Sequence, residues 1–217
     1  SSNAATSGAT SLYQSTFFFR TADNRVYKVL DNNGGTAYSG AEPTSESTSP
    51  FALGGYILKY MYTITASEQT KYLTADFIPV STDSTVSAAA VDGKIESLQI
   101  TAGSGYTDGT YYAAVYGDGT SAGTSSGAIV SIVVTSGAIV SFGLTAGTDT
   151  SIHDGGTGYT FGTVNLASGY TFSDAALSSA SAIGGSGGAV DVVISPKEGH
   201  GNDAVAELGG HYVMMRT

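Results

Sequence analysis

Apolar and polar residues alternate along several short stretches of this chain. In the stretch 56–64 every second residue is apolar, which is the period of a β-strand with one buried face. The residues that would share this face are Tyr56, Leu58, Tyr60, Tyr62 and Ile64. The runs 17–20 and 25–30 predict two further strands, and the polar residues 21–24 predict the turn of a hairpin between them.

Two short helices are expected at the sites where this alternation stops. Ser67 can cap a helix over 67–73, with an acidic residue in its first turn. The segment 203–208 can form one or two helical turns that end before Gly209. The chain is otherwise expected to be poor in helix.

Three further segments complete the outer parts of the chain. Residues 77–80 predict an edge strand, because Pro79 cannot donate a hydrogen bond to a central ladder. Residues 81–92 are small and polar, which is typical of a linker. Residues 211–215 predict a last strand.

The second half of the chain contains an internal repeat. Residues 93–107 recur in part as 137–147, and after an insert the copy ends at 156–160 in Gly-Thr-Gly-Tyr-Thr, much as the first copy ends in Gly-Ser-Gly-Tyr-Thr. Such self-similarity indicates one duplicated supersecondary unit. Alternating apolar residues predict that the unit is β. The strand-like runs of this half are 94–101, 111–116, 128–135, 138–145, 163–166 and 189–194.

Composition supports a turn-rich β protein. The 217 residues include 30 Gly but also 41% hydrophobic residues, with 14 Tyr and 8 Phe, which is too apolar for a disordered chain. We expect a mainly β fold of antiparallel β-sandwich-type domains, with Gly-rich turns and one or two short helices. The expected domains are a discontinuous one over 1–84 and 190–217 and an inserted one of duplicated β units over 85–189. The pattern leaves open whether the repeats form a sandwich or a small barrel.

Charge and cysteine content narrow the possible partners. The formal net charge is −10, and no cluster of Lys or Arg is present, so a nucleic-acid partner is not expected. The absence of cysteine excludes disulfides and thiolate metal sites. No run approaches 18 apolar residues, so we expect a soluble protein without a membrane segment.

Catalytic motifs occur only as formal matches. Residues 184–188 read Gly-Gly-Ser-Gly-Gly, but a strand follows where a nucleophile elbow needs a helix, so Ser186 is expected in a hairpin loop. Residues 117–122 match a Gly-rich dinucleotide pattern without a following helix, which predicts a turn. A hydrolase would need a cleft that joins His153 or His200 to a carboxylate. We expect no enzymatic activity and no cofactor.

No metal site is expected either. The histidines lack the spacing of a zinc site, and the loop aspartates do not form a calcium-binding run. The residues considered are His153, His200 and His211 for zinc, and Asp118, Asp149, Asp154 and Asp174 for calcium.

The tyrosines allow two interpretations. Packing within the fold and contact between subunits are the commoner uses of aromatic stripes on strands. Alternatively, Tyr106 and Tyr159, which occupy equivalent repeat positions, would line the ligand sites of a host-surface or glycan-binding module. Under the first interpretation the same two residues plug the ends of their own β units.

Two groups of segments resemble a baseplate wedge protein of T-even-type contractile-tailed phages, in the version carried by marine cyanophages. The first group reads VYKVLDN, EPTS, GYILKYMYTI and FIPV at 26–32, 42–45, 55–64 and 77–80. The second is similar to the signature P-x-x-G-H-G-x-D…E-L-G-G and occupies 194–203 and 207–215. The family often has an aromatic residue where this chain has Leu58.

The resemblance implies a non-enzymatic subunit of the phage virion that is assembled in the host cytoplasm, and a chain that is a fragment of a longer protein. The implied partners are other baseplate wedge proteins and a second copy in a homodimer. No catalytic residue is carried over. The positions expected to matter for structure or for an interface are Tyr60, Tyr62, Tyr106, Tyr159, His200 and Asp203.

Overall fold

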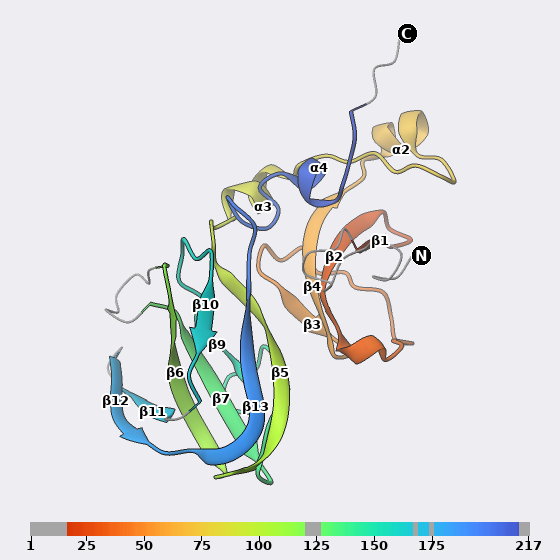
Figure 1. The fold of residues 1–217 in the computed structure, drawn as a ribbon. Helices are drawn as coiled ribbons and strands as arrows, with labels where there is room; N and C mark the ends of the chain where they lie inside the picture. Colours follow the sequence, from red (N-terminus) through yellow and green to blue (C-terminus); the bar gives the residue numbers. More distant parts are fainter. Residues whose placement is uncertain (1–16, 120–126, 167–168, 174–175, 213–217) are drawn as a thin grey trace. The chain divides into compact units, whose positions relative to one another are not determined.

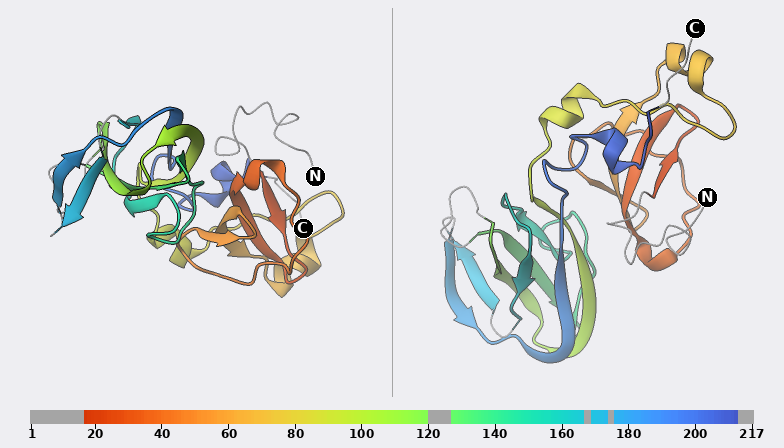
Figure 2. Two further views of the ribbon diagram at one scale, coloured as in Figure 1. Left: turned by 90° about the horizontal axis from the view of Figure 1, so that it is seen from below. Right: turned by 45° about the horizontal axis from the view of Figure 1, so that its top comes forward.

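The chain divides into two compact units of antiparallel β-sheet. The computed structural model describes residues 17–119, 127–166, 169–173 and 176–212. Unit 1 comprises Ser1–Ala90 and His200–Thr217, and unit 2 comprises Val91–Gly199 (Figure 1). Figure 2 shows the strands of each unit from two further directions. With 43% strand and 11% helix, the fold is mainly β, as the sequence predicts.

Unit 1 is built on a four-stranded sheet within the described residues. Its order is β1 (Phe18–Arg20), β2 (Arg25–Asn32), β4 (Tyr56–Thr63) and β3 (Phe51–Leu53). The predicted hairpin between the first two strands is confirmed, and Asn24 takes a left-handed φ of 63° in its turn. After β2 a single 3₁₀ turn, η2 (Asn33–Gly35), leads the chain away from the sheet.

A β-bulge in β4 interrupts the alternation that the sequence shows. Val26 pairs with Tyr62 and Tyr27 pairs with Tyr60, so Met61 is an extra residue on its strand. Tyr60 and Tyr62 therefore point to opposite faces of the sheet, and the prediction that they share one face is wrong. Regular period-2 alternation cannot reveal a bulge, because the bulge is a property of the paired strands.

Each face of this sheet has its own hydrophobic cluster. One face packs against α4 (Ala204–Glu207), and the other against Val86 of α3 (Ser84–Ala88). The first cluster consists of Val26, Met61, Tyr62, Ile64, Ala204 and Leu208. The second consists of Tyr27, Tyr60 and Val86, with Phe19 stacked on the Tyr27 ring and Phe51 in edge contact with it.

The helices differ in detail from the prediction. α2 (Ala66–Tyr72) is capped by Thr65 instead of Ser67, and α4 is capped by Asp203. α3 is a third helix, and it lies in the segment predicted as a linker. It forms because the Asp83 carboxylate accepts hydrogen bonds from two backbone N–H groups of its first turn, while Val86 is fully buried. No helix in the described ranges is long and apolar enough to cross a membrane.

Two predicted strands of unit 1 are not formed in the described residues. Residues 77–80 run as an irregular segment, in which Ile78 and Val80 pack on the first cluster and the Pro79 carbonyl accepts a hydrogen bond from the Tyr62 hydroxyl at 2.9 Å. Packing and a side-chain hydrogen bond thus hold this segment without strand pairing. His211 and Tyr212 are outside any strand, and residues 213–215 lie outside the described part.

Unit 2 has two layers. One layer is a long ladder between β5 (Ile95–Tyr106) and β13 (Gly184–Ile194). The other layer, counted over the described residues, is a seven-stranded sheet. Its main path is β12 (Ala176–Ser181), β11 (Gly169–Ser173), β6 (Gly109–Gly117), β7 (Ile129–Thr135) and β8 (Ala138–Ile139), while β10 (Gly162–Val164) pairs with β6 and β9 (Ser151–Asp154) with β7.

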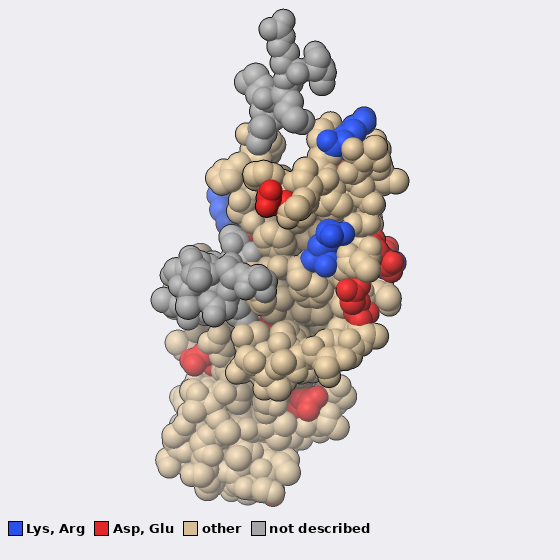
Figure 3. Space-filling view, turned by 90° about the vertical axis from the view of Figure 1, so that its right-hand side faces the viewer, with Lys and Arg blue, Asp and Glu red and all other residues tan. Residues whose placement is uncertain are grey.

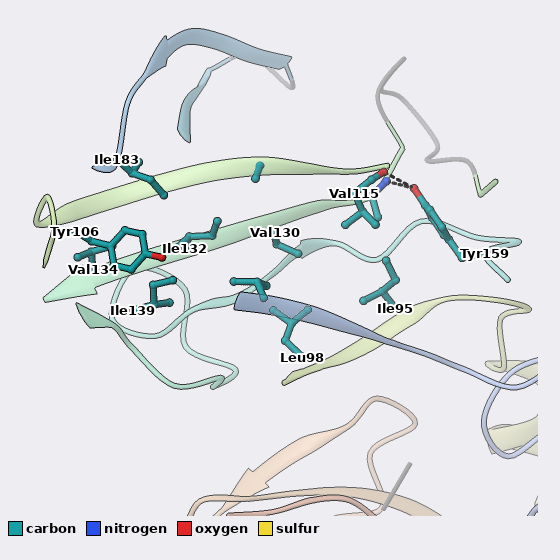
Figure 4. Packing of buried hydrophobic residues seen from close by; sticks show 13 residues of the cluster. Ile95, Leu98, Tyr106, Val115, Val130, Ile132, Val134, Ile139, Tyr159 and Ile183 are labelled. Atoms are coloured by element: carbon teal, nitrogen blue, oxygen red, sulfur yellow. Dashed lines mark hydrogen bonds between the residues drawn. The ribbon is translucent and has the colours of Figure 1, made fainter. Parts of the chain in front are cut away.

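The core of unit 2 lies between these layers (Figure 4). Leu98 of β5 faces every second residue of β7 in Figure 4, and Val190 of β13 belongs to the same cluster. Those β7 residues are Val130, Ile132 and Val134. Tyr106 and Tyr159 belong to the same cluster and lie at opposite ends of the row of side chains in Figure 4. This arrangement agrees with the sandwich alternative.

The repeat does not produce two copies of one substructure. Residues 95–106 form the single strand β5, whereas in the second copy β8 ends at Ile139 and the predicted strand over 138–145 gives way to isolated bridges around Phe142. The predicted hairpin loop at 184–188 is also wrong. It forms part of β13, where Ser186 pairs with Ser104 of β5.

The unit boundaries differ from those expected. Residues 190–199 belong to unit 2, because β13 pairs with β5 as far as Ile194. Residues 85–90 belong to unit 1, because Val86 packs against Tyr27 and Tyr60. A boundary depends on which core a segment joins, and composition does not carry that information.

Candidate functional site

The Gly-His-Gly motif and α4 build a buried charged cluster in unit 1. The Glu207 carboxylate contacts Lys28 through its Oε1 atom, which lies 2.9 Å from the lysine Nζ, and the same oxygen contacts His200 Nδ1. All three side chains are at least nine-tenths buried. α4 positions Glu207 because the Asp203 carboxylate caps the helix by accepting from Ala206 N at 3.0 Å.

The cluster keeps Glu207 ionised. Burial by itself raises the pKa of this carboxyl group, but the hydrogen bond to His200, the charges of His200 and Lys28 and a hydrogen bond from Gly201 N–H lower it to about 2. The last bond reaches Oε2 at 2.7 Å, so both carboxylate oxygens have partners. A carboxylate that stays charged over the whole neutral range is suited to an ion pair and poorly suited to proton transfer at neutral pH.

A second buried lysine lies on the neighbouring strand, paired with the first. Lys59 of β4 pairs with Lys28 of β2, and its Nζ donates to the Thr48 carbonyl. Like charges opposite each other on paired strands repel. The carboxylate of Glu207 offsets this repulsion and so stabilises the sheet at this point. The cluster can therefore hold α4 against β2, and its buried groups give a substrate no access.

Two glycines of the signature are required by close approach. Gly199 has φ +93°, and a Cβ atom there would lie 2.3 Å from Val91 N. Gly201 has φ +86°, and a Cβ there would lie 2.4 Å from Val86 Cγ1. Any other L-residue would be strained at either position and would meet those atoms. These two glycines of the signature are therefore needed for the fold of this segment.

The equivalent tyrosines of the repeat are core residues with hydrogen-bonded hydroxyls. Tyr106 Oη accepts from Gly188 N at 3.0 Å, and Tyr159 Oη accepts from Ala128 N at 2.6 Å. Glycines surround both rings, since a Cβ at Gly185 would lie 2.4 Å from the Tyr106 ring. Both tyrosines are buried, so they cannot line the ligand sites of a binding module as the alternative interpretation expected.

The remaining predicted positions are also mostly internal. Tyr60 and Tyr62 are buried, and burial raises the pKa of each phenol. Their hydroxyls bond within unit 1, to Thr63 Oγ1 and to the Pro79 carbonyl. Asp203, by contrast, is exposed apart from its role as a cap.

The acidic residues of the loops serve local structure. Asp118 accepts from Thr160 N at 2.8 Å, and Asp154 accepts from Gly156 N at 2.9 Å. Where the structure describes the chain, no three His, Asp or Glu side chains gather as metal ligands would. In the view of Figure 3 charged side chains are few and mixed in sign, so neither unit shows a large patch of one charge there.

Sequence reasoning missed the exposed aromatic residues. Tyr72 at the end of α2 is 45% exposed and Phe77 beyond it is 73% exposed. α2 itself buries none of its residues, and a capping box between Thr65 and Glu68 closes its first turn. We call residues 66–80 the α2 arm. The helical part of its sequence lacks an apolar stripe. That absence is the sequence signal from which an unburied helix could have been predicted.

Comparisons with known proteins identify no relative of this chain. No protein-family model matches the sequence, and no curated protein or solved structure gives a match.

Proposed function

We propose that this chain is a non-enzymatic structural subunit of a phage virion, namely a baseplate wedge protein that works through protein–protein interfaces. Two kinds of observation support the proposal. The motifs that resemble the wedge family are engaged in folding unit 1, with His200 and Glu207 buried in an ion cluster. The α2 arm, in turn, exposes the rings of Tyr72 and Phe77 to solvent, while Ile78 and Val80 fix its end on the first cluster.

The α2 arm is the observation that carries the proposal. A helix of seven residues is marginal in water unless packing supports it, yet α2 has no buried residue. Tyr72 and Phe77 add exposed rings on the same short segment. Exposed aromatic surface of this kind is typical of residues that become buried in an interface. We infer that a neighbouring wedge protein covers the arm.

Reconstitution with the other wedge proteins of the same phage tests the proposal. Purified chain is mixed with them, and complexes are measured by size-exclusion chromatography with light scattering. We expect the double variant Tyr72→Ala, Phe77→Ala to bind at least tenfold more weakly, because central aromatic contacts dominate interface energies. The matched control is Tyr116→Ala, Phe161→Ala, which removes two exposed rings from unit 2 and should leave assembly unchanged.

Two results would contradict the proposal. One is the absence of any complex with the wild-type chain. The other is equal binding by the two double variants, which would show that the α2 arm is not a contact. The same light-scattering runs also measure the chain alone, for which the proposal expects a homodimer.

A further inference from the structure

An exposed aromatic pair lies on the outer face of unit 2. Tyr116 of β6 is 56% exposed and Phe161, next to β10, is 60% exposed. Tyr116 pairs with Thr163, and Phe161 lies two residues before Thr163, so both rings are on the same side of the ladder. Gly162, between Phe161 and Thr163, faces inward, since a Cβ there would lie 2.8 Å from Val115 Cγ1. We call Tyr116 and Phe161 the β6–β10 pair.

The backbone beneath the pair is held in place by hydrogen bonds. The Asp118 carboxylate accepts from Thr160 N at 2.8 Å and from Phe161 N at 3.3 Å, and a bond from the Thr160 hydroxyl completes the set. These hydrogen bonds lower the pKa of Asp118, and the bond from the Thr160 hydroxyl has the largest effect. Next to them Tyr159 is anchored in the core. A preorganised surface loses little entropy on binding.

The polar groups around the pair suit an uncharged ligand. Hydroxyls of Thr160 and Thr163 are exposed nearby, while Asp118 already accepts three hydrogen bonds. Within 91–199 the sequence has Lys94 and Lys197 as its basic residues, against a larger number of acidic ones. An anionic ligand would therefore be repelled.

The pair by itself offers too little surface for a second copy of the chain, and it stands on a regular ladder, whereas the α2 arm adds a whole helix without a buried residue to its two rings. The two rings together expose about 200–250 Å², taking about 200 Å² for a whole aromatic side chain. A stable dimer buries roughly 800 Å² on each partner. A narrow ligand that crosses two rings needs much less surface.

We propose that the β6–β10 pair binds a neutral saccharide chain. The face of an aromatic ring carries negative quadrupole charge, which attracts the positively polarised C–H groups of a sugar ring. The backbones of diagonal residues on neighbouring strands are roughly 7–8 Å apart, so two rings carried there can contact two sugars of one chain. The Thr160 hydroxyl donates to Asp118 and the Thr163 hydroxyl to the Tyr116 carbonyl, so both can still accept hydrogen bonds from sugar hydroxyls at the edge. This activity goes beyond the proposed structural role and differs from a site at Tyr106 and Tyr159.

Affinity electrophoresis with dissolved polysaccharides tests the proposal. The full chain is run in gels that contain dextran, laminarin or mannan, with alginate as the anionic comparison. We expect retardation by at least one neutral polymer and none by alginate. The double variant Tyr116→Ala, Phe161→Ala should weaken the interaction at least tenfold, whereas Tyr72→Ala, Phe77→Ala should keep it.

Two milder variants protect the test against loss of folding. Tyr116→Phe keeps a ring and should keep binding, while Phe161→Leu keeps apolar bulk without a ring and should lose most of it. The proposal is overturned if no neutral polymer retards the chain, if the double variant binds as well as wild type, or if alginate binds equally. It is also overturned if the double variant converts a dimer to a monomer, which would assign the pair to self-association. Assembly with wedge proteins is measured separately, so either proposal can fail alone.

Discussion

The carboxylate of Glu207 is contacted from three sides inside unit 1. Lys28 of β2 and the adjacent residues His200 and Gly201 surround it, so it joins two segments that are far apart in the sequence. Burial of one charge without partners is prohibitive, so these groups are stable only together. At the scale of single residues, this cluster shows that the polar groups of the signature are engaged in structure.

The cluster predicts an acid-sensitive unit 1. The pKa of Glu207 is about 2 in the folded state against a usual 4.5, so its contribution is complete above pH 4.5 and is lost as pH falls toward 2. That difference corresponds to on the order of 3 kcal/mol of unfolding free energy. Glu207→Gln should lose about 3–5 kcal/mol at pH 7, because it leaves Lys28 buried without its carboxylate.

Urea unfolding followed by circular dichroism at pH 7 and pH 3 measures both effects. The control is Asp76→Asn, which alters an exposed carboxylate of the same unit. Wild type and the control should lose stability between the two pH values more steeply than Glu207→Gln. An equally steep loss in Glu207→Gln would show that the cluster does not govern the acid response.

At the scale of elements, the helices of unit 1 form two classes. α4 packs on the sheet through Ala204, while α2 buries nothing and depends on its capping box. Local hydrogen bonds can therefore form a helix that opens without unfolding of the core.

Removal of each helix cap should separate the two classes. Thr65→Ala breaks the capping box and should make α2 amides exchange faster, with a change in global unfolding free energy within about 0.5 kcal/mol. Asp203→Ala removes the cap of α4 and should lower global stability by about 1 kcal/mol. Hydrogen exchange and urea unfolding on both variants measure this, and similar global losses would contradict the separation.

At the scale of the whole molecule, unit 2 has its own core, and its first and last segments lie next to each other. Its first and last segments are joined by hydrogen bonds from Ser195 N to the Lys94 carbonyl at 2.8 Å and from Glu198 N to Asp92 Oδ1 at 3.0 Å. A unit whose ends meet can be inserted into another domain with little disturbance.

Unit 2 should accordingly fold alone. A chain of residues 91–199 is expected to give a β-type circular dichroism spectrum and a cooperative thermal transition. Tyr159→Phe should lower its stability by about 1–3 kcal/mol, because Ala128 N–H loses its acceptor inside the core. Tyr116→Phe, at an exposed position, is the control and should change it by less than about 0.5 kcal/mol. An unfolded fragment would show that the unit needs the rest of the chain.

The sequence by itself determined the class of fold and several elements. Alternating apolar residues predicted β-structure, and the polar turn at 21–24 predicted the first hairpin correctly. These features depend on neighbours along the chain, so they are visible in one dimension. Helical turns over 203–208 were predicted for the same reason, since Gly209 ends them, and α4 occupies 204–207 of that segment.

Only the tertiary structure decided which of these residues meet. The bulge at Met61, the pairing of 184–188 with β5 and the ion cluster around Glu207 all join segments that are far apart in sequence or depend on strand register. Exposure was decided in the same way, because Tyr106 and Tyr116 are the same residue type ten positions apart on successive strands. One fills the core and the other faces solvent, because Tyr106 of β5 points between the two layers and Tyr116 of β6 points away from them.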